Sequence, residues 1–311
     1  MCTVSIIPFA LPHAATAPIP IGSSHGAPTS HAQTVRPLGF RIVTNRDELR
    51  TRPPAIDPAW HDFEPGGRRA IYPIDPAGGG TWIGGSTSGL VLCLLNGNPI
   101  PAPTLPPKSK LVSRGVIIPR LFARAGSDPS LSAVLANLAS FDLSGFAPFR
   151  LVAVTPSADP ARHGFVAVEA SWDRTELIQR EHPTGPACFV SSGLGDPLVK
   201  PRITLFNELV RASRSSLADL PAAQDRFHRH TWTDRTEISV MMSRREARTV
   251  SITSIEVSPT VDAEHAECSL LLEYEPIDHR AAASPAHADQ VVPAAAKHRV
   301  VVPARVARRA Q

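Results

Sequence analysis

The feature that most constrains this chain is a cysteine at its second position, directly before a short apolar run. The chain begins Met1-Cys2, and the segment Thr3–Ile7 has the composition of a buried strand. We expect aminopeptidases to remove Met1, because they cleave before small side chains. The mature chain would then start with a thiol beside a free α-amine. The amine (pKa about 8) can accept the proton of the thiol (about 8.5), so the pair is a self-contained nucleophile. The alternative is that a Cys at this position has no chemical role.

Proline and low-complexity segments indicate how the chain is divided. Apolar residues make up 42% and charged residues 19% of the 311 positions, which is typical of a soluble globular protein. Residues 8–37 are rich in Pro, Ala, Ser, Thr and His and read as a low-complexity insertion. Residues 280–311 read as a disordered basic tail of Ala, Pro, Val and Arg. The sequence therefore predicts a single domain over residues 1–279.

Charge and cysteine spacing exclude several function classes. The net charge is +4, but residues 280–311 alone carry +5, so the rest sums to about −1 and offers no basic face for nucleic acid. No run approaches the ~20 apolar residues of a membrane span, and the N-terminus lacks the pattern of a secretory signal. The four cysteines are far apart, which argues against a metal site and a disulfide framework. We expect a cytoplasmic protein without metal or organic cofactor.

The order of predicted elements favours an α+β fold. Thr3–Ile7 and Phe40–Thr44 are expected to pair as a hairpin interrupted by the insertion, with the second strand ending at Asn45. Thr81–Gly84 and Leu90–Leu95 form a second predicted strand pair. Helices follow, and strands then return, which is not the order of a doubly wound sheet. The further predicted helices cover about 113–125, from 128 onward, and 197–213; the further strands cover 149–155, 164–170, 187–191, 249–257 and 268–274.

Several motifs, taken in order, resemble one protein family. The motifs are Met1-Cys2, Asn45-Arg46-Asp47-Glu48 with Arg52-Pro53 just beyond it, the glycine-rich run Gly79–Gly84, Gly89 with the apolar run into Asn96, Ser113-Arg114-Gly115, and Ser239–Met242 with Ala247–Ser251. Together they resemble the NRDE family, which includes the transport and Golgi organisation 2 proteins. The resemblance implies an N-terminal-nucleophile hydrolase fold, a four-layer αββα sandwich of two antiparallel sheets. It is similar to the cysteine branch that includes choloylglycine hydrolases and penicillin V acylases, which cleave amide bonds.

The resemblance also implies site residues at the end of the second strand. In the cysteine branch the N-terminal Cys attacks a carbonyl, while an Arg and an Asp steady the thiol and the amine; here those residues would be Cys2, Arg46 and Asp47. Asn45 and Glu48 belong to the same segment and are expected to support it. The alternative is a salt-bridged turn that only closes the strand. Charged groups at the end of a buried strand require compensating partners in either case.

Five further residues are candidates for the pocket, each with an ordinary structural alternative. Asn96 could donate to an oxyanion or occupy an Asn-Gly turn. Trp82 could line the pocket or lie in the core. His228 could titrate near the site or lie on the surface. Arg114 and Ser192 are expected to support the pocket. Eukaryotic family members tend to have Asn near Ser192, which leaves the second oxyanion donor open.

The sequence leaves more than one function open. The leading hypothesis is a cysteine amidohydrolase acting on a small amide or acyl conjugate, with Cys2 as nucleophile. The second is a non-enzymatic carrier that holds acyl lipid, acyl-CoA or haem in the same pocket, which the resemblance also implies. A third is a partner-binding protein that works through the basic tail. Fold alone does not decide between them.

Overall fold

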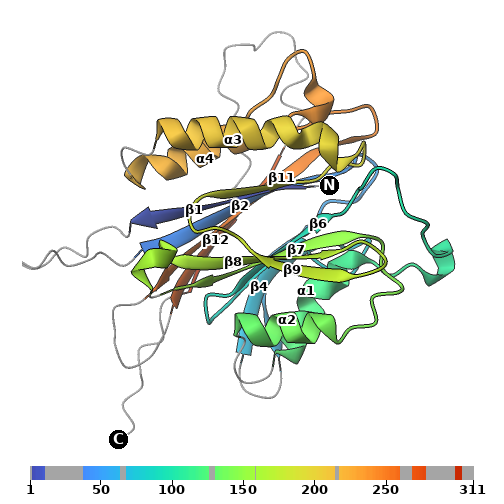
Figure 1. Ribbon diagram of the computed structural model, residues 1–311, viewed down its shortest axis with the longest axis horizontal. Helices are drawn as coiled ribbons and strands as arrows, with labels where there is room; N and C mark the ends of the chain where they lie inside the picture. Colours follow the sequence, from blue (N-terminus) through green and yellow to red (C-terminus); the bar gives the residue numbers. More distant parts are fainter. Residues whose placement is uncertain are drawn as a thin grey trace, which may run out of the picture.

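The central strands of the second sheet are apolar on both faces, and this pattern determines the layers of the molecule. The computed structural model describes residues 2–10, 38–63, 68–125, 130–157, 159–213, 217–259, 268–277 and 298–302. Strand β6 (Val91–Asn96) illustrates the pattern, because Val91, Cys93 and Leu95 face one apolar layer and Leu92 and Leu94 face another. A strand buried on both sides requires a covering layer on each face. The described chain accordingly forms two stacked antiparallel sheets with helices outside each (Figure 1).

The first sheet has six strands, and each neighbouring pair is antiparallel. In spatial order the strands are β10 (Ala187–Val190), β1 (Cys2–Ala10), β2 (Leu38–Leu49), β11 (Ala247–Pro259), β12 (Cys268–Pro276) and β13 (His298–Val302).

The second sheet has seven strands, all antiparallel to their neighbours and in the order of the chain. They are β3 (Ile56–Phe63), β4 (Arg68–Ile74), β5 (Ile83–Ser86), β6, β7 (Phe149–Pro156), β8 (Phe165–Trp172) and β9 (Leu177–Glu181).

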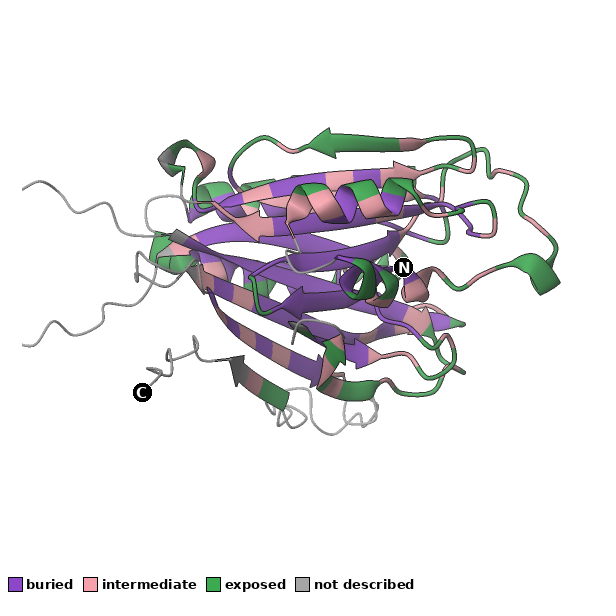
Figure 2. Ribbon diagram, turned by 90° about the horizontal axis from the view of Figure 1, so that it is seen from below, coloured by how far each residue is buried: buried purple, intermediate pink, exposed green. Residues whose placement is uncertain are grey.

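Two helices cover the outer face of each sheet. Helices α3 (Lys200–Ala212) and α4 (Leu220–His228) lie over the first sheet, while α1 (Ile117–Arg124) and α2 (Leu131–Ala139) lie over the second (Figure 1). Each helix buries one apolar stripe and exposes the opposite face, as the banded helices in Figure 2 show. The largest apolar layer lies between the two sheets. The predicted αββα sandwich of two antiparallel sheets is confirmed.

The predicted hairpin between the first two strands is also confirmed, but both strands are longer than expected. The register runs from Cys2 opposite Arg46 to Ala10 opposite Leu38. The first three residues of the expected insertion, 8–10, therefore belong to β1, and the rest of it lies outside the described residues. Strand β2 does not end at Asn45, because pairing with β11 continues to Leu49.

The predicted tail requires a correction. Strand β13, within the segment expected to be disordered, pairs with β12 and places Val300 opposite Leu272 at the edge of the central apolar layer. The imidazole of His298 lies 3.2 Å from Asp57 of β3 in the other sheet. Composition did not reveal this strand, because its Val-Val-Val run is short and follows a long Ala- and Pro-rich stretch. Residues 278–297 and 303–311 lie outside the described residues.

Candidate active site

A cavity of about 510 Å³ opens where the first two strands end. Its wall combines the beginning of β1, the end of β2, the glycine-rich loop before β5, the end of β6 and the segment before α1. The lining includes four of the predicted site residues, Cys2, Arg46, Asp47 and Asn96, together with the predicted pocket residues Glu48, Trp82 and Arg114. The fold therefore brings together segments that lie more than 100 residues apart in the chain.

Cys2 is held at the cavity wall by strands on both sides. Its backbone nitrogen donates a hydrogen bond to Ser191 Oγ at 3.1 Å, and the nitrogen of Ser191 donates to the Cys2 carbonyl at 3.0 Å. On the other side Cys2 lies directly opposite Arg46 in the β1–β2 ladder. The residue is only 5% exposed. Strand pairing thus fixes the nitrogen and the thiol together.

Strand alternation divides the Asn45–Glu48 segment between two faces of the sheet. Because β2 continues through this segment, Arg46 shares the face of Cys2, whereas Asn45 points toward the helices. Asn45 Nδ2 donates to the carbonyls of His228 and Val240, at 2.9 and 3.0 Å. Asn45 therefore ties β2 to the helix layer and does not line the cavity. A turn, as the sequence suggested, would have gathered all four side chains at one place.

Arg46 lies in a network of acids and an aromatic ring. Its guanidinium carbon is 4.4 Å from the centroid of the Trp82 ring, a cation–π distance. Its Nη2 lies 3.4 Å from Asp75 Oδ1 and 3.7 Å from Glu48 Oε2. The sequence did not single out Asp75, whose two oxygens accept hydrogen bonds from Arg52 of the Arg52-Pro53 motif. The only available signal was an acid just before the glycine-rich loop.

Two buried nitrogen donors in the cavity wall have no hydrogen-bond acceptor among the described residues. They are Arg46 Nη2 and Trp82 Nε1, and both residues are at most 6% exposed. Leaving a buried donor unpaired costs roughly 1–3 kcal/mol, so such groups in a native structure call for an explanation. Oxygen acceptors on a bound ligand are one way to supply the missing hydrogen bonds. Trp82 also belongs to the central apolar layer, so it lines the cavity and lies in the core at the same time.

The carboxylate of Asp47 lies on the side of the first sheet that faces the helices. Thr249 Oγ1 donates to Asp47 Oδ1 at 2.6 Å, and Arg202 Nη1 of α3 lies 3.7 Å from Oδ2. Burial raises the pKa of Asp47, and the Arg202 charge opposes that rise. Arg202 is itself fully buried and donates to Thr3 Oγ1 at 2.7 Å. No local pattern in the sequence pointed to Arg202, because its position in α3 is ordinary for an exposed arginine.

The Cys2 thiol is protonated near neutral pH in this arrangement. Burial raises its pKa above the ordinary value, and the charge of Arg46 offsets only part of the rise. Asp75 behaves in the opposite way. Burial would raise its pKa, but the hydrogen bond from Arg52 and the charge of Arg46 bring it below the ordinary value. The cavity therefore presents a neutral thiol, a cation and an ionised carboxylate.

The remaining predicted pocket residues occupy three different positions. Arg114 lines the cavity, and its Nη1 donates to the Pro148 carbonyl at 2.8 Å. Asn96 ends β6 at the cavity wall. In the Ser192 segment it is Gly193 that lines the cavity, whereas the Ser192 hydroxyl accepts from Arg244 Nη2 at 3.1 Å.

His228 lies neither at the cavity nor on the surface, which corrects both expectations. It is buried under α4, where its Nε2 is 2.7 Å from Ser5 Oγ and its Nδ1 is 2.5 Å from Asn45 Oδ1. Burial, together with the charges of Arg41 and Arg229, holds its pKa well below the ordinary value. His228 is thus a neutral hydrogen-bonding residue between sheet and helices. The helical spacing that buries it extends from Leu220 and Phe227, a pattern the sequence interpretation did not use.

Gly80 and Gly115 allow two segments of the cavity wall to pack against each other. A Cβ atom on Gly80 would lie 2.2 Å from the carbonyl carbon of Gly115, and Thr81 donates to that same carbonyl at 3.0 Å. The glycine-rich loop and the Ser113–Gly115 motif are therefore in direct backbone contact. The glycines of the two segments allow their backbones to approach closely, which only residues without a side chain permit.

The described parts of the chain contain no helix with the length and apolar character needed to cross a membrane. Within the same residues, no three His, Cys, Asp or Glu side chains are grouped so that they could hold a metal ion.

Comparisons with known proteins place the chain in a family. A solved structure described as a Caenorhabditis elegans N-acylethanolamine-hydrolyzing acid amidase ortholog is similar in fold, with 11% identity, a TM-score of 0.44, and coverage of 81% of this chain and 91% of that one. A comparison with curated protein sequences found no significant match. The family model for Transport and Golgi organisation 2 matches residues 33–241, about two thirds of the chain, and includes the Asn45–Glu48, Gly79–Gly84 and Ser113–Gly115 motifs. This chain is therefore a member of the Transport and Golgi organisation 2 family.

Proposed function

We propose that the protein is a cysteine amidohydrolase that acts on a small amide or acyl conjugate, with Cys2 as the nucleophile. The observation that carries the proposal is the position of Cys2 at a cavity wall that also contains two buried donors, Arg46 Nη2 and Trp82 Nε1, with no hydrogen-bond acceptor among the described residues. Hydrolysis of an amide passes through an oxyanion, and donors fixed before the reaction stabilise it most effectively. Asn96 adds an amide group to the same wall.

The proposed reaction requires the removal of Met1. The Cys2 nitrogen, which donates to Ser191 Oγ, would then be an α-amine. The amine accepts the thiol proton, and the sulfur attacks the carbonyl carbon to form a C–S bond and an oxyanion. Collapse of that intermediate breaks the C–N bond, and the amine returns the proton to the leaving nitrogen. Water then hydrolyses the thioester, which releases the acid and restores the thiol. Arg46 favours the thiolate throughout.

A neighbouring apolar cavity supports an acyl group as part of the substrate. It measures about 310 Å³ and shares Arg114, Ala147 and Gly193 with the Cys2 cavity. Its other lining residues include Ile100 and Leu105, which are 62% and 47% exposed. An acyl chain extending from a carbonyl at Cys2 would cover this apolar surface.

A carrier for acyl lipid, acyl-CoA or haem is the second candidate. The raised pKa of Cys2 favours it, because a protonated thiol is a poor nucleophile and behaves as a small apolar group. The same two cavities would then bind the ligand without cleaving it. We propose a cytoplasmic location for either function, supported by four cysteines that are all free.

The test is the reaction of Cys2 with iodoacetamide, followed by intact mass, combined with amidase assays on short-chain acyl p-nitroanilides. The proposal expects loss of Met1, rapid single alkylation, and loss of both alkylation and hydrolysis in Cys2→Ser. Cys268→Ser is the matched control, since burial raises the pKa of Cys268 to about 11 and keeps it unreactive. Retention of Met1 would exclude the amine-assisted mechanism. If Cys2→Ala binds a fluorescent fatty acid or haem as the unmodified protein does, and neither hydrolyses amides, the carrier function holds instead.

A further inference from the structure

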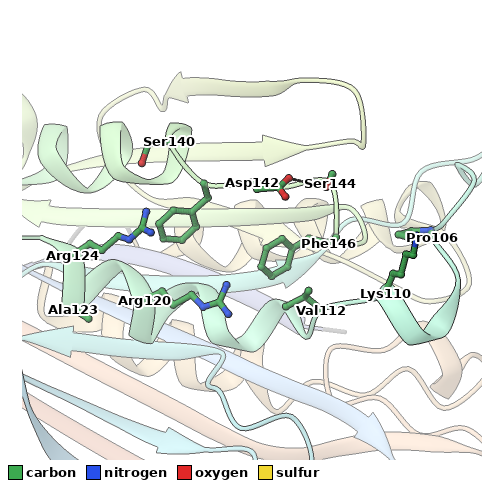
Figure 3. Close-up of a pocket in the computed structure, with 12 residues that line it drawn as sticks. Pro106, Lys110, Val112, Arg120, Ala123, Arg124, Ser140, Asp142, Ser144 and Phe146 are labelled. Carbon is green, nitrogen blue, oxygen red and sulfur yellow. Dashed lines mark hydrogen bonds between the residues drawn. The ribbon is translucent and has the colours of Figure 1, made fainter.

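A second and larger cavity, of about 700 Å³, lies on the outer side of the second sheet. Helix α1, the segment that follows α2, and the segment before the Ser113–Gly115 motif form its walls (Figure 3). It is distinct from the Cys2 cavity, with which it shares Val112. The lining residues are Pro106, Lys110, Val112, Arg120, Ala123, Arg124, Ser140, Phe141, Asp142, Ser144, Gly145 and Phe146.

The charges around this cavity are mainly positive. Lys110, Arg120 and Arg124 line it, against the single carboxylate of Asp142. None of the three cations forms an ion pair with a carboxylate of the described residues. Arg120 and Arg124 are one helical turn apart on α1, a spacing at which like charges repel. Figure 3 shows both extending from α1 toward the segment of Asp142 and Ser144. A bound anion would remove this repulsion.

Asp142 offsets only one of the three positive charges that line the cavity. Its Oδ1 accepts a hydrogen bond from the backbone nitrogen of Ser144 at 3.0 Å. The hydrogen bonds from Ser144 lower the pKa of Asp142, so the carboxylate stays ionised. The lining still carries two more positive than negative side chains.

Aromatic and aliphatic groups form much of the remaining wall. Phe146 is almost fully buried and packs edge-on against Phe149, with ring centroids 6.3 Å apart, so its position is fixed by the core. The Arg124 guanidinium lies 4.8 Å from the centroid of the Phe141 ring. A small hydrated ion would leave the partly exposed Phe141 ring in contact with water. A ligand with a flat ring would cover it, because aromatic rings and guanidinium groups both offer stacking surfaces.

We propose that this cavity binds an organic phosphate of the nucleotide class, with the phosphate between Arg120, Arg124 and Lys110 and the ring against Phe141 and Phe146. Arginine suits phosphate because its planar donors match two phosphate oxygens at once. The cavity volume lies within the usual range for small-molecule sites, roughly 300–1,000 Å³. Binding at this site does not require that Cys2 carry out the proposed reaction.

Because Val112 lines both cavities, two kinds of ligand fit the outer cavity. Val112 donates to the Gly145 carbonyl at 2.9 Å and bridges to Phe146, and this segment separates the two cavities. The nucleotide group is either a separate ligand or the far end of a molecule whose reactive carbonyl reaches Cys2. In both cases a phosphate group contacts Arg120 and Arg124.

Calorimetric titration with ADP, adenosine and inorganic pyrophosphate tests the site. We expect ADP to bind more tightly than either fragment, because it carries both recognised groups. The double variant Arg120→Gln/Arg124→Gln should weaken ADP binding about tenfold or more, which corresponds to about 1.4 kcal/mol. The matched control is Arg211→Gln/Arg226→Gln, which removes two exposed arginines from α3 and α4 on the opposite face and should leave the affinity unchanged.

Three results would overturn the proposal: no heat of binding at millimolar ADP, equal loss of affinity in both double variants, or equal affinity for ADP and pyrophosphate. The four arginines are exposed, so both variants should fold, and thermal unfolding checks this. The rate of Cys2 alkylation with and without ADP then distinguishes a separate ligand from one molecule that spans both cavities. ADP that slows alkylation in the unmodified protein, but not in Arg120→Gln/Arg124→Gln, supports one ligand that spans both cavities. An unchanged rate alongside measurable binding supports a separate ligand.

Discussion

At the scale of single residues, Arg46 is a side-chain cation that acts directly on the thiol. It lies opposite Cys2 in the ladder, over Trp82 and beside Asp75. Its positive charge lowers the pKa of Cys2 against the larger effect of burial. Removing that charge should therefore leave the thiol protonated over a wider range of pH.

We predict that Arg46→Gln shifts the pH dependence of Cys2 alkylation to higher pH and slows the reaction at pH 8. Rates measured by mass spectrometry over a pH series give the shift. Arg52→Gln is the control, because Arg52 contacts Asp75 and Glu48 and not Cys2. A profile that is the same for Arg46→Gln and the unmodified protein would contradict this account of the thiol.

His228 makes stability depend on pH. Its pKa is depressed in the folded state, while the unfolded chain has a value near 6.5. Below that pH the unfolded state binds a proton that the folded state does not. The contribution of His228 to the free energy of unfolding is therefore fully present above pH 6.5 and is lost as the pH falls below it. The limiting slope for one proton is about 1.4 kcal/mol per pH unit. We predict a smaller loss of unfolding free energy between pH 7 and pH 5 in His228→Gln, measured by urea unfolding. The exposed His163→Gln should keep the original slope; equal slopes in all three proteins would contradict the prediction.

At the scale of elements, the contact between the glycine-rich loop and the Ser113–Gly115 motif shapes the cavity. Gly80→Ala would place a methyl group against the backbone of Gly115, where no flexible side chain can move aside. We predict a loss of about 1–3 kcal/mol in unfolding free energy, the usual cost of overpacking. Gly115→Ala is the control, since its Cβ would meet its nearest atom at 3.3 Å. Equal losses in the two variants would show that the close contact is not the cause.

The elements also indicate how far the sequence could predict the site. The β1–β2 hairpin followed from two strand patterns, and the family motifs identified most of the cavity wall. The orientation of Asn45 did not follow, because it depends on β2 continuing past its predicted end, which only pairing with β11 determines. Asp75 and Arg202 were missed because their ion-pair partners come from distant parts of the chain, and a single charged residue in a loop or helix carries no local signal.

At the scale of the whole molecule, β13 joins the edges of the two sheets. It extends the first sheet beside β12, and His298 reaches Asp57 of β3. Without it, β12 would become an edge strand with unpaired backbone groups, which favours association between molecules.

We predict that a chain ending at residue 297 associates in a concentration-dependent manner, whereas a chain ending at residue 302 does not. The shorter chain should also unfold at lower temperature, because Val300 no longer packs against the central apolar layer. Light scattering coupled to size exclusion measures the first effect and calorimetry the second. Two monomeric chains of equal stability would show that β13 contributes little.

The segment at Val112 has a thermodynamic consequence for the whole molecule. One side chain lies in the wall of both cavities, so a ligand that displaces it in one alters the shape of the other. Such an effect must be reciprocal: if an occupant of the outer cavity changes the affinity of the Cys2 cavity by some factor, an occupant of the Cys2 cavity changes the outer affinity by that same factor. Coupling between the two can therefore be measured from either side, and the two measurements must agree.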